Sequence, residues 1–156
     1  LFHRVLDCYA QVLRTLDFDR IAGIPYGSLP TATGLSLQLH KPLIYPRKEV
    51  KAHGTRRLVE GEFNDGETVA VVDDILITGG SVLDGIAKLE SSGLKVNDVV
   101  VFLDHGGLQD TRAQERFNAK GLNIQAVLSL ETISDVLEEA ERISASQAEE
   151  LRGHRS

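Results

Sequence analysis

The stretch VAVVDDILITGGS, residues 69–81, gives the strongest indication of the fold and points to one site. It begins as a continuous apolar run, which is typical of a strand that is buried on both faces of a parallel sheet. The run ends in two adjacent aspartates, and the chain then passes through Thr-Gly-Gly-Ser into an amphipathic segment. Glycines at a helix start let backbone amides approach an anion closely, and the helix N-terminus adds partial positive charge. The stretch therefore predicts a strand, an anion-binding turn and a helix, in that order.

The rest of the chain alternates between short apolar runs and segments with helical spacing. Uniformly apolar runs, without an in-and-out alternation, are typical of a parallel sheet that helices cover on both faces. We therefore predict an α/β fold, with a mostly parallel central sheet flanked by helices on both faces, in a single domain of residues 1–156. The segment 47–58 is polar and basic, which predicts a loop. The expected strands are 20–25, 42–46, 68–73, 98–104 and 124–130, and the expected helices are 1–16, 28–40, 81–93, 108–121 and 132–152.

Composition narrows the class of protein. The formal net charge of −6 argues against a non-specific nucleic-acid binder, whose footprint would be basic. The single cysteine, Cys8, allows no intramolecular disulfide and shares a helical face with Val5 and Val12, which indicates a packed thiol in a reducing compartment. No apolar run approaches the length of a membrane span, so we expect a cytoplasmic protein with no membrane partner. The chain has no methionine and begins inside a helical pattern, so we expect a preceding segment in the full-length protein.

The two aspartates and the turn that follows them are suited to different parts of a ligand. Thr78 and Ser81 can donate hydroxyl hydrogen bonds to phosphate oxygens. The carboxylates of Asp73 and Asp74 would repel a phosphate unless they hold sugar hydroxyls or a divalent cation that already bridges phosphates. A ribose 5-phosphate has both parts, although either feature taken alone is also compatible with a solvated turn.

Several segments resemble one known family. VVDDILITGGS (71–81) resembles the phosphoribosyl-pyrophosphate (PRPP) motif of the type I phosphoribosyltransferases. YPRKEVKAHGTRRLVEG (45–61) is similar to the catalytic loop of orotate phosphoribosyltransferases, including the domain fused to orotidylate decarboxylase in bifunctional UMP synthases. IPYGSLPTATGLSL (24–37) and the spacing from VVVFLD (99–104) to the next two glycines also match, so the resemblance covers nearly the whole chain.

The resemblance implies the type I phosphoribosyltransferase fold and a role for each matching residue. It assigns Asp73 and Asp74 to the ribose hydroxyls, Thr78, Gly79, Gly80 and Ser81 to the 5-phosphate, and Tyr26, Gly27, Arg47, Lys48, Lys51 and His53 to the pyrophosphate. Of these, Lys51, His53, Arg47 and Asp74 are the implied catalytic residues. A loop of cations can neutralise a departing pyrophosphate, and His53 has a pKa suited to proton transfer near neutrality. A solvated basic loop is the alternative for the segment 47–58.

The same resemblance implies cofactors and partners. It predicts a Mg²⁺-dependent pentosyltransferase that takes PRPP and orotate, with Mg²⁺ carried by PRPP and not bound directly by protein side chains. It also implies a homodimer in which the basic loop partly serves the neighbouring subunit. A fused or associated orotidylate decarboxylase is a further expected partner.

Three departures from the family pattern bear on the substrate. Ile77 stands where the family usually has threonine, and the segment Asp104-His105-Gly106-Gly107 is shorter by two residues and lacks the arginine that approaches the orotate carboxylate in relatives. The N-terminal segment that helps to enclose the pyrimidine in relatives is not within residues 1–156, and we expect it in the preceding part of the full-length protein. Ile77 and His105 are accordingly the candidate base-binding residues, and for His105 a bond to nearby backbone is an equal alternative. Orotate phosphoribosyl transfer is the expected function. The alternatives are another nucleobase and a non-catalytic PRPP-sensing module.

Overall fold

The computed structural model describes residues 1–49 and 57–153. Six strands form one sheet in the order β3-β2-β1-β4-β5-β6. β3 pairs antiparallel with β2, and every other neighbouring pair is parallel, which confirms the predicted mostly parallel sheet. The strands are β1 (Arg20–Gly23), β2 (Leu43–Pro46), β3 (Val59–Glu60), β4 (Thr68–Leu76), β5 (Lys95–Asp104) and β6 (Asn123–Ser129). The helices are α1 (Phe2–Leu13), α2 (Leu29–Leu39), α3 (Gly80–Ser91), α4 (Thr111–Ala119), α5 (Leu130–Glu139) and α6 (Ala145–Gly153).

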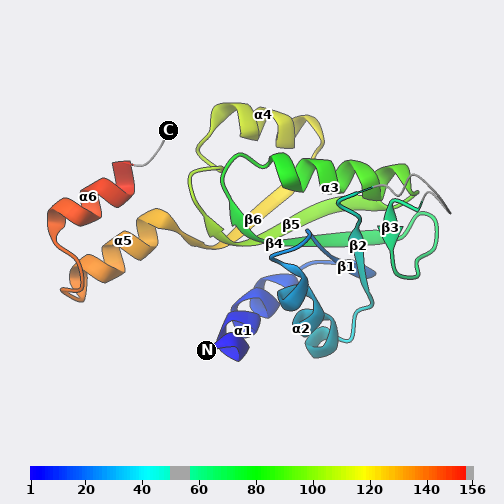
Figure 1. The fold of residues 1–156 in the computed structure, drawn as a ribbon, viewed down its shortest axis with the longest axis horizontal. Helices are drawn as coiled ribbons and strands as arrows, with labels where there is room; N and C mark the ends of the chain where they lie inside the picture. Colours follow the sequence, from blue (N-terminus) through cyan, green and yellow to red (C-terminus); the bar gives the residue numbers. More distant parts are fainter. Residues whose placement is uncertain (50–56, 154–156) are drawn as a thin grey trace.

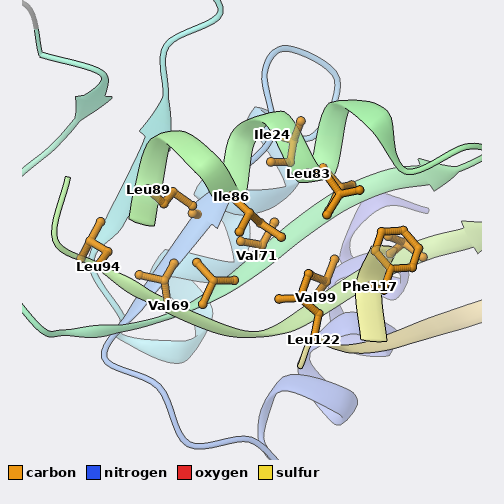
Figure 2. Packing of buried hydrophobic residues seen from close by; sticks show 14 of the residues in the cluster. Ile24, Val69, Val71, Leu83, Ile86, Leu89, Leu94, Val99, Phe117 and Leu122 are labelled. Carbon is orange, nitrogen blue, oxygen red and sulfur yellow. The ribbon is translucent and has the colours of Figure 1, made fainter. Parts of the chain in front are cut away.

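Helices cover both faces of the sheet, as predicted (Figure 1). α3 and α4 lie on one face, where Ile86 and Phe117 pack against Val71 and Val99 of the central strands (Figure 2). α1 and α2 lie on the other face and form a second core with Val72 and Val100 among others. The central strands therefore bury side chains on both faces, which is the physical reason for their continuous apolar sequence.

The strand that carries the two aspartates is longer than predicted. β4 continues to Leu76 because β5 pairs with it as far as Leu76 opposite Asp104. Its other neighbour, β1, ends at Gly23, which pairs with Val72. Asp73 and the residues after it therefore have no β1 residue paired beside them, which leaves a gap in the sheet on that side of β4. The chain winds outward from β1 to β2 on one side and from β4 to β6 on the other, so this place is the topological switch point, where open α/β sheets bind ligands.

One strand was not predicted, and one predicted helix was wrong. The short antiparallel strand β3 falls inside the family-matching basic segment and directly follows the range predicted to be a loop. The single helix predicted over 132–152 is two helices, α5 and α6, which extend away from the sheet (Figure 1). The break contains a capping box, in which the Gln147 amide donates to Ser144 Oγ at 3.2 Å and the Ser144 amide donates to Gln147 Oε1 at 2.9 Å. This Ser-x-x-Gln pattern was a readable signal in the sequence.

The N-terminal helix packs on the sheet, and Val5 and Val12, the residues predicted to share a face with Cys8, are partly buried against the same core. α1 buries Leu6, Tyr9, Ala10 and Leu13 against the sheet, and Cys8 is only half-buried beside them. Among residues 1–49 and 57–153, the structure contains no helix both long and apolar enough to cross a bilayer.

Candidate functional site

A cleft of about 270 Å³ opens at the switch point between β1 and β4. Its walls come from the turn after β1, the carboxyl half of β4 and the turn that leads into α3. The cleft is lined by Ile24, Pro25, Gly27, Asp73, Asp74, Ile75, Leu76, Ile77, Thr78, Gly79 and Ser81. The structure therefore brings together most of the residues that the sequence assigned to ribose and phosphate, and it adds the candidate base residue Ile77.

The two aspartates differ in exposure. Asp73 is 5% exposed, whereas Asp74 is exposed at the cleft. The Asp74 carboxylate lies against the turn after β1, since a Cβ on Gly27 would be only 2.4 Å from Asp74 Oδ2. Glycine at position 27 thus leaves room for the carboxylate that faces the cleft.

Asp73 lies behind Asp74. Its Oδ1 accepts a hydrogen bond from the Asp74 amide at 3.0 Å, and its backbone carbonyl accepts one from the Tyr9 hydroxyl at 2.6 Å. Burial raises the pKa of Asp73 to about 7; the bond from the Asp74 amide opposes the rise and the nearby Asp74 charge adds to it. The exposed carboxylate of Asp74 therefore faces the cleft, whereas the charge of Asp73 behind it depends on pH near neutrality.

The raised pKa of Asp73 predicts a loss of stability as pH rises from about 4 to about 7. The unfolded carboxyl ionises near pH 3.8 and the folded one near 7, so in this window the unfolded chain binds fewer protons and a rise in pH favours unfolding. We expect the wild-type free energy of unfolding to fall by about 3 kcal/mol across the window relative to Asp73→Asn, which keeps an oxygen acceptor but does not titrate. Denaturant unfolding at a series of pH values measures this. Parallel pH profiles for the two proteins would contradict it.

The glycine turn, residues Thr78, Gly79, Gly80 and Ser81, connects β4 to α3. Gly79 has a φ of +69°, and a Cβ there would be 2.2 Å from Cζ of Phe117, so both backbone conformation and core packing require glycine. No side chain of the described residues caps the N-terminus of α3, so the first amides of that helix remain for another acceptor. Thr78 and Ser81 are exposed beside them. This geometry suits an anion, in agreement with the sequence prediction.

A second hollow of about 170 Å³ adjoins the cleft at Ser81. We call it the basic hollow; Arg47, Lys48 and Lys88 line it together with Asp84. The remaining lining residues are Ile24, Pro25, Pro46 and Gly85.

Two predicted pyrophosphate residues meet at the edge of the basic hollow. The peptide bond between Pro25 and Tyr26 is cis, and the Tyr26 side chain is 64% exposed. Lys48 Nζ lies 5.2 Å from the centroid of the Tyr26 ring, which is within the range of a cation–π contact. The Arg47 guanidinium is ion-paired with Glu60 of β3. Lys51 and His53 lie outside the described residues.

Sequence reasoning missed Lys88. This half-buried side chain of α3 donates hydrogen bonds to the backbone carbonyls of Arg47 at 2.7 Å and Lys48 at 3.3 Å. Its position could have been inferred from helical spacing, because Ser81, Asp84 and Lys88 recur at the interval that places residues on one helix face.

The structure does not bring the two base candidates together. Ile77 lines the cleft, whereas His105 lines a separate hollow of about 20 Å³ shared with Arg152 of α6. The turn is held both by β4, since the His105 amide donates to the Leu76 carbonyl at 2.8 Å, and within itself, since the buried Asp104 accepts from the Leu108 amide at 3.0 Å.

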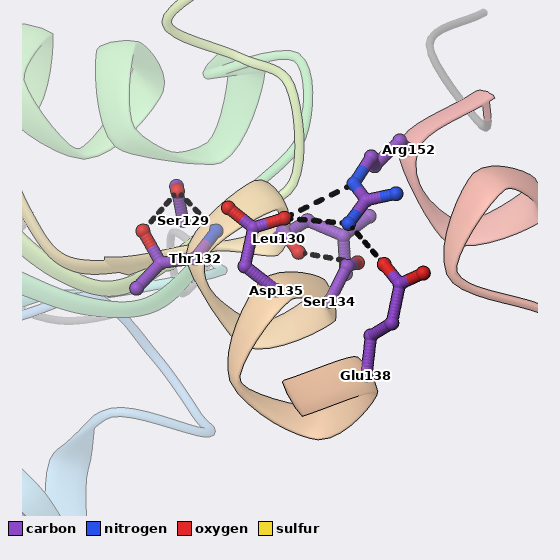
Figure 3. Close-up of polar contacts among 7 residues, drawn as sticks. All are labelled: Ser129, Leu130, Thr132, Ser134, Asp135, Glu138 and Arg152. Carbon is purple, nitrogen blue, oxygen red and sulfur yellow. Dashed lines mark hydrogen bonds and ion pairs between the residues drawn. The ribbon is translucent and has the colours of Figure 1, made fainter. Parts of the chain in front are cut away.

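Arg152, which lines the same hollow as His105, is held by carboxylates of α5. Its guanidinium is ion-paired with Asp135 at 2.6 Å and Glu138 at 2.7 Å, which fastens α6 to α5 (Figure 3). The same close-up shows α5 held at its start, where Ser134 Oγ donates to the Leu130 carbonyl at 2.7 Å. The carboxylates of Asp135 and Glu138 therefore partly neutralise the positive charge of Arg152.

Comparison with known proteins gives matches over most of the chain. A family model described as "Phosphoribosyl transferase domain" matches residues 4–131. The bifunctional enzyme PyrF/PyrE of Nostoc sp. is 54% identical over 147 residues, which is 94% of this chain and 30% of that protein. The structure of Leishmania donovani UMP synthase has a TM-score of 0.86 at 34% identity and covers 99% of this chain, which matches 32% of that one. For orotate phosphoribosyltransferase from Aeropyrum pernix the TM-score is 0.74 at 34% identity, with 92% of this chain and 77% of that one covered. The chain thus spans about a third of the length of the first two relatives.

Proposed function

The chain belongs to the phosphoribosyl transferase domain family, and on that premise we propose that it transfers the phosphoribosyl group of PRPP to orotate, giving orotidine 5′-phosphate and pyrophosphate in pyrimidine biosynthesis. The observation that carries the proposal is the cleft at the switch point, where an exposed carboxylate stands beside an uncapped helix start with two hydroxyls. Orotate is favoured as the base because the Aeropyrum relative is named for it and matches over 92% of this chain.

The cleft and the basic hollow divide the substrate between them. We place the 5-phosphate on the glycine turn and the ribose hydroxyls on Asp74, with Asp73 behind it. The pyrophosphate then lies toward Tyr26, Gly27 and the basic hollow. As a ring nitrogen of the base bonds to C1 of the ribose, the bond from C1 to the pyrophosphate oxygen breaks and its electron pair leaves with the pyrophosphate. Arg47 and Lys48 line the basic hollow, and we propose that they stabilise that developing negative charge.

Several parts of the proposal rest on the sequence alone. Lys51 and His53 are proposed as further catalytic residues, with His53 as the group that can transfer a proton near neutral pH. Mg²⁺ is proposed to enter as its PRPP complex, where it neutralises phosphate charge; within 1–49 and 57–153 no group of three or more His, Cys, Asp or Glu side chains could hold a metal ion. A homodimer with a shared loop, a cytoplasmic location and a fused or associated orotidylate decarboxylase also remain proposals. The last is supported by the bifunctional Nostoc relative.

The direct test is consumption of PRPP by the full-length protein with a panel of nucleobases. We expect pyrophosphate release with orotate and little or none with uracil, adenine or hypoxanthine. Turnover with a different base, and none with orotate, would identify that base as the substrate. Tight PRPP binding without turnover on any base would favour the sensing module instead.

Another nucleobase is the second candidate, because His105 replaces an arginine and does not line the cleft. If this position still faces the orotate carboxylate during binding, His105→Arg should restore a charged hydrogen bond and improve the preference for orotate over uracil by about tenfold, or about 1–2 kcal/mol. Competition binding with the two bases measures the preference, and His105→Gln serves as the neutral control. An unchanged preference in His105→Arg would show that the turn does not read the carboxylate.

A further inference from the structure

Lys88 joins two parts of the site that are distant in sequence. It lies on α3, the helix that begins at the glycine turn, and α3 packs on β2. Its ammonium donates to the carbonyls of Arg47 and Lys48, the first two residues after β2. An ammonium has three N–H donors, and these contacts use two of them.

The segment that Lys88 holds is also anchored from the opposite side. The Arg47 amide donates to the Leu58 carbonyl at 2.7 Å, and the Arg47 side chain pairs with Glu60. Without Lys88, the carbonyls of Arg47 and Lys48 would lose the hydrogen bonds from its ammonium. The hollow would then contain two cationic side chains and the carboxylate of Asp84, in place of three cations and one carboxylate.

We propose that Lys88 is a positioning residue for the pyrophosphate of PRPP. It neutralises the carbonyls of Arg47 and Lys48, directs this segment so that both side chains line the basic hollow, and adds its own charge there. This inference rests on the proposed function and extends it, because it names a group on α3 that discriminates PRPP from a ligand without pyrophosphate.

The test compares two ligands in the full-length protein. In Lys88→Met, PRPP affinity measured by calorimetry should fall about tenfold, whereas affinity for orotidine 5′-phosphate, which has no pyrophosphate, should change less than twofold. The KM for PRPP should rise correspondingly. Lys88→Arg should recover most of the loss, because it retains the charge and the donors. Lys95 begins β5, at the end of the strand opposite to the carboxyl end. The Lys95→Met protein should therefore bind both ligands as the wild type does.

Hydrogen exchange of the ligand-free protein provides a readout that is independent of substrate. The Arg47 amide should exchange faster in Lys88→Met and at the wild-type rate in Lys95→Met. Equal losses for PRPP and orotidine 5′-phosphate would show a general disturbance of α3 and would overturn the inference, as would unchanged PRPP affinity. If the wild type itself binds no PRPP, the proposed function fails, and an unchanged Arg47 exchange rate would then overturn the positioning role as well.

Discussion

Gly80→Asp is expected to weaken PRPP binding by at least about 100-fold, or about 2.7 kcal/mol, without destabilising the fold. A Cβ at Gly80 meets only Thr78 Oγ1, at 3.7 Å, so the backbone and the core have room for it. Gly80 is also the first residue of α3, where a carboxylate interacts favourably with the helix dipole. The same carboxylate would stand where the 5-phosphate is proposed to bind and would repel it. Calorimetry with PRPP and thermal unfolding measure the two effects.

The matched control is Gly80→Asn, which has nearly the same size without the charge. It should lose much less affinity than Gly80→Asp, which separates repulsion from crowding. Gly79 is unsuitable for this experiment, since any side chain there would collide with Phe117. A folded Gly80→Asp protein that binds PRPP as tightly as the wild type would contradict the phosphate assignment of the glycine turn.

Two inactive variants are expected to restore activity when they are refolded together. Lys51→Ala retains a good ribose site but supplies a poor loop, whereas Asp74→Asn supplies a good loop but has a poor ribose site. If the full-length protein is a homodimer whose loop serves the neighbouring subunit, each mutant homodimer lacks one component at every site. In a mixed dimer the ribose site of the Lys51→Ala chain receives the intact loop of its partner, so one of the two sites is complete. Activity should then reach a substantial fraction of the wild-type value.

The reciprocal control joins both substitutions in one chain. When the Lys51→Ala/Asp74→Asn double variant is mixed in excess with the wild type, a loop that acts on the neighbouring subunit leaves every mixed dimer inactive. A loop that acts within its own chain leaves the wild-type site of each mixed dimer complete. If mass spectrometry detects mixed dimers and the two single variants remain inactive together, the shared loop is excluded.

The sequence by itself determined the class of fold and the position of the main site. Continuous apolar runs predicted strands buried on both faces, and the core confirms this because helices cover the sheet on each side. The aspartate pair and the glycine turn predicted a site for a ribose 5-phosphate, and Asp74, Thr78 and Ser81 line one cleft. These features were readable because strand burial and helix starts leave local patterns that span only a few residues.

Other local features were decided by partners distant in sequence. β4 extends past Asp73 because β5 continues to pair with it, and no pattern in residues 68–76 reports the length of the neighbouring strand. The two-residue strand β3 is too short for a periodicity to show, and it forms because β2 offers it an edge. The break between α5 and α6 is different, since its capping box was present in the sequence.

Only the tertiary structure assigned unequal roles to residues that look alike in sequence. Asp73 and Asp74 are adjacent carboxylates, yet burial raises the pKa of Asp73 while Asp74 faces the cleft. A side chain at Gly79 would collide with Phe117 of the core, whereas a side chain at Gly80 has space. Lys88 is an ordinary helix lysine until folding brings β2 against α3 and places two carbonyls within its reach. Charge, burial and free space at one residue depend on which distant segments surround it, and a linear pattern contains that information only after the chain has folded.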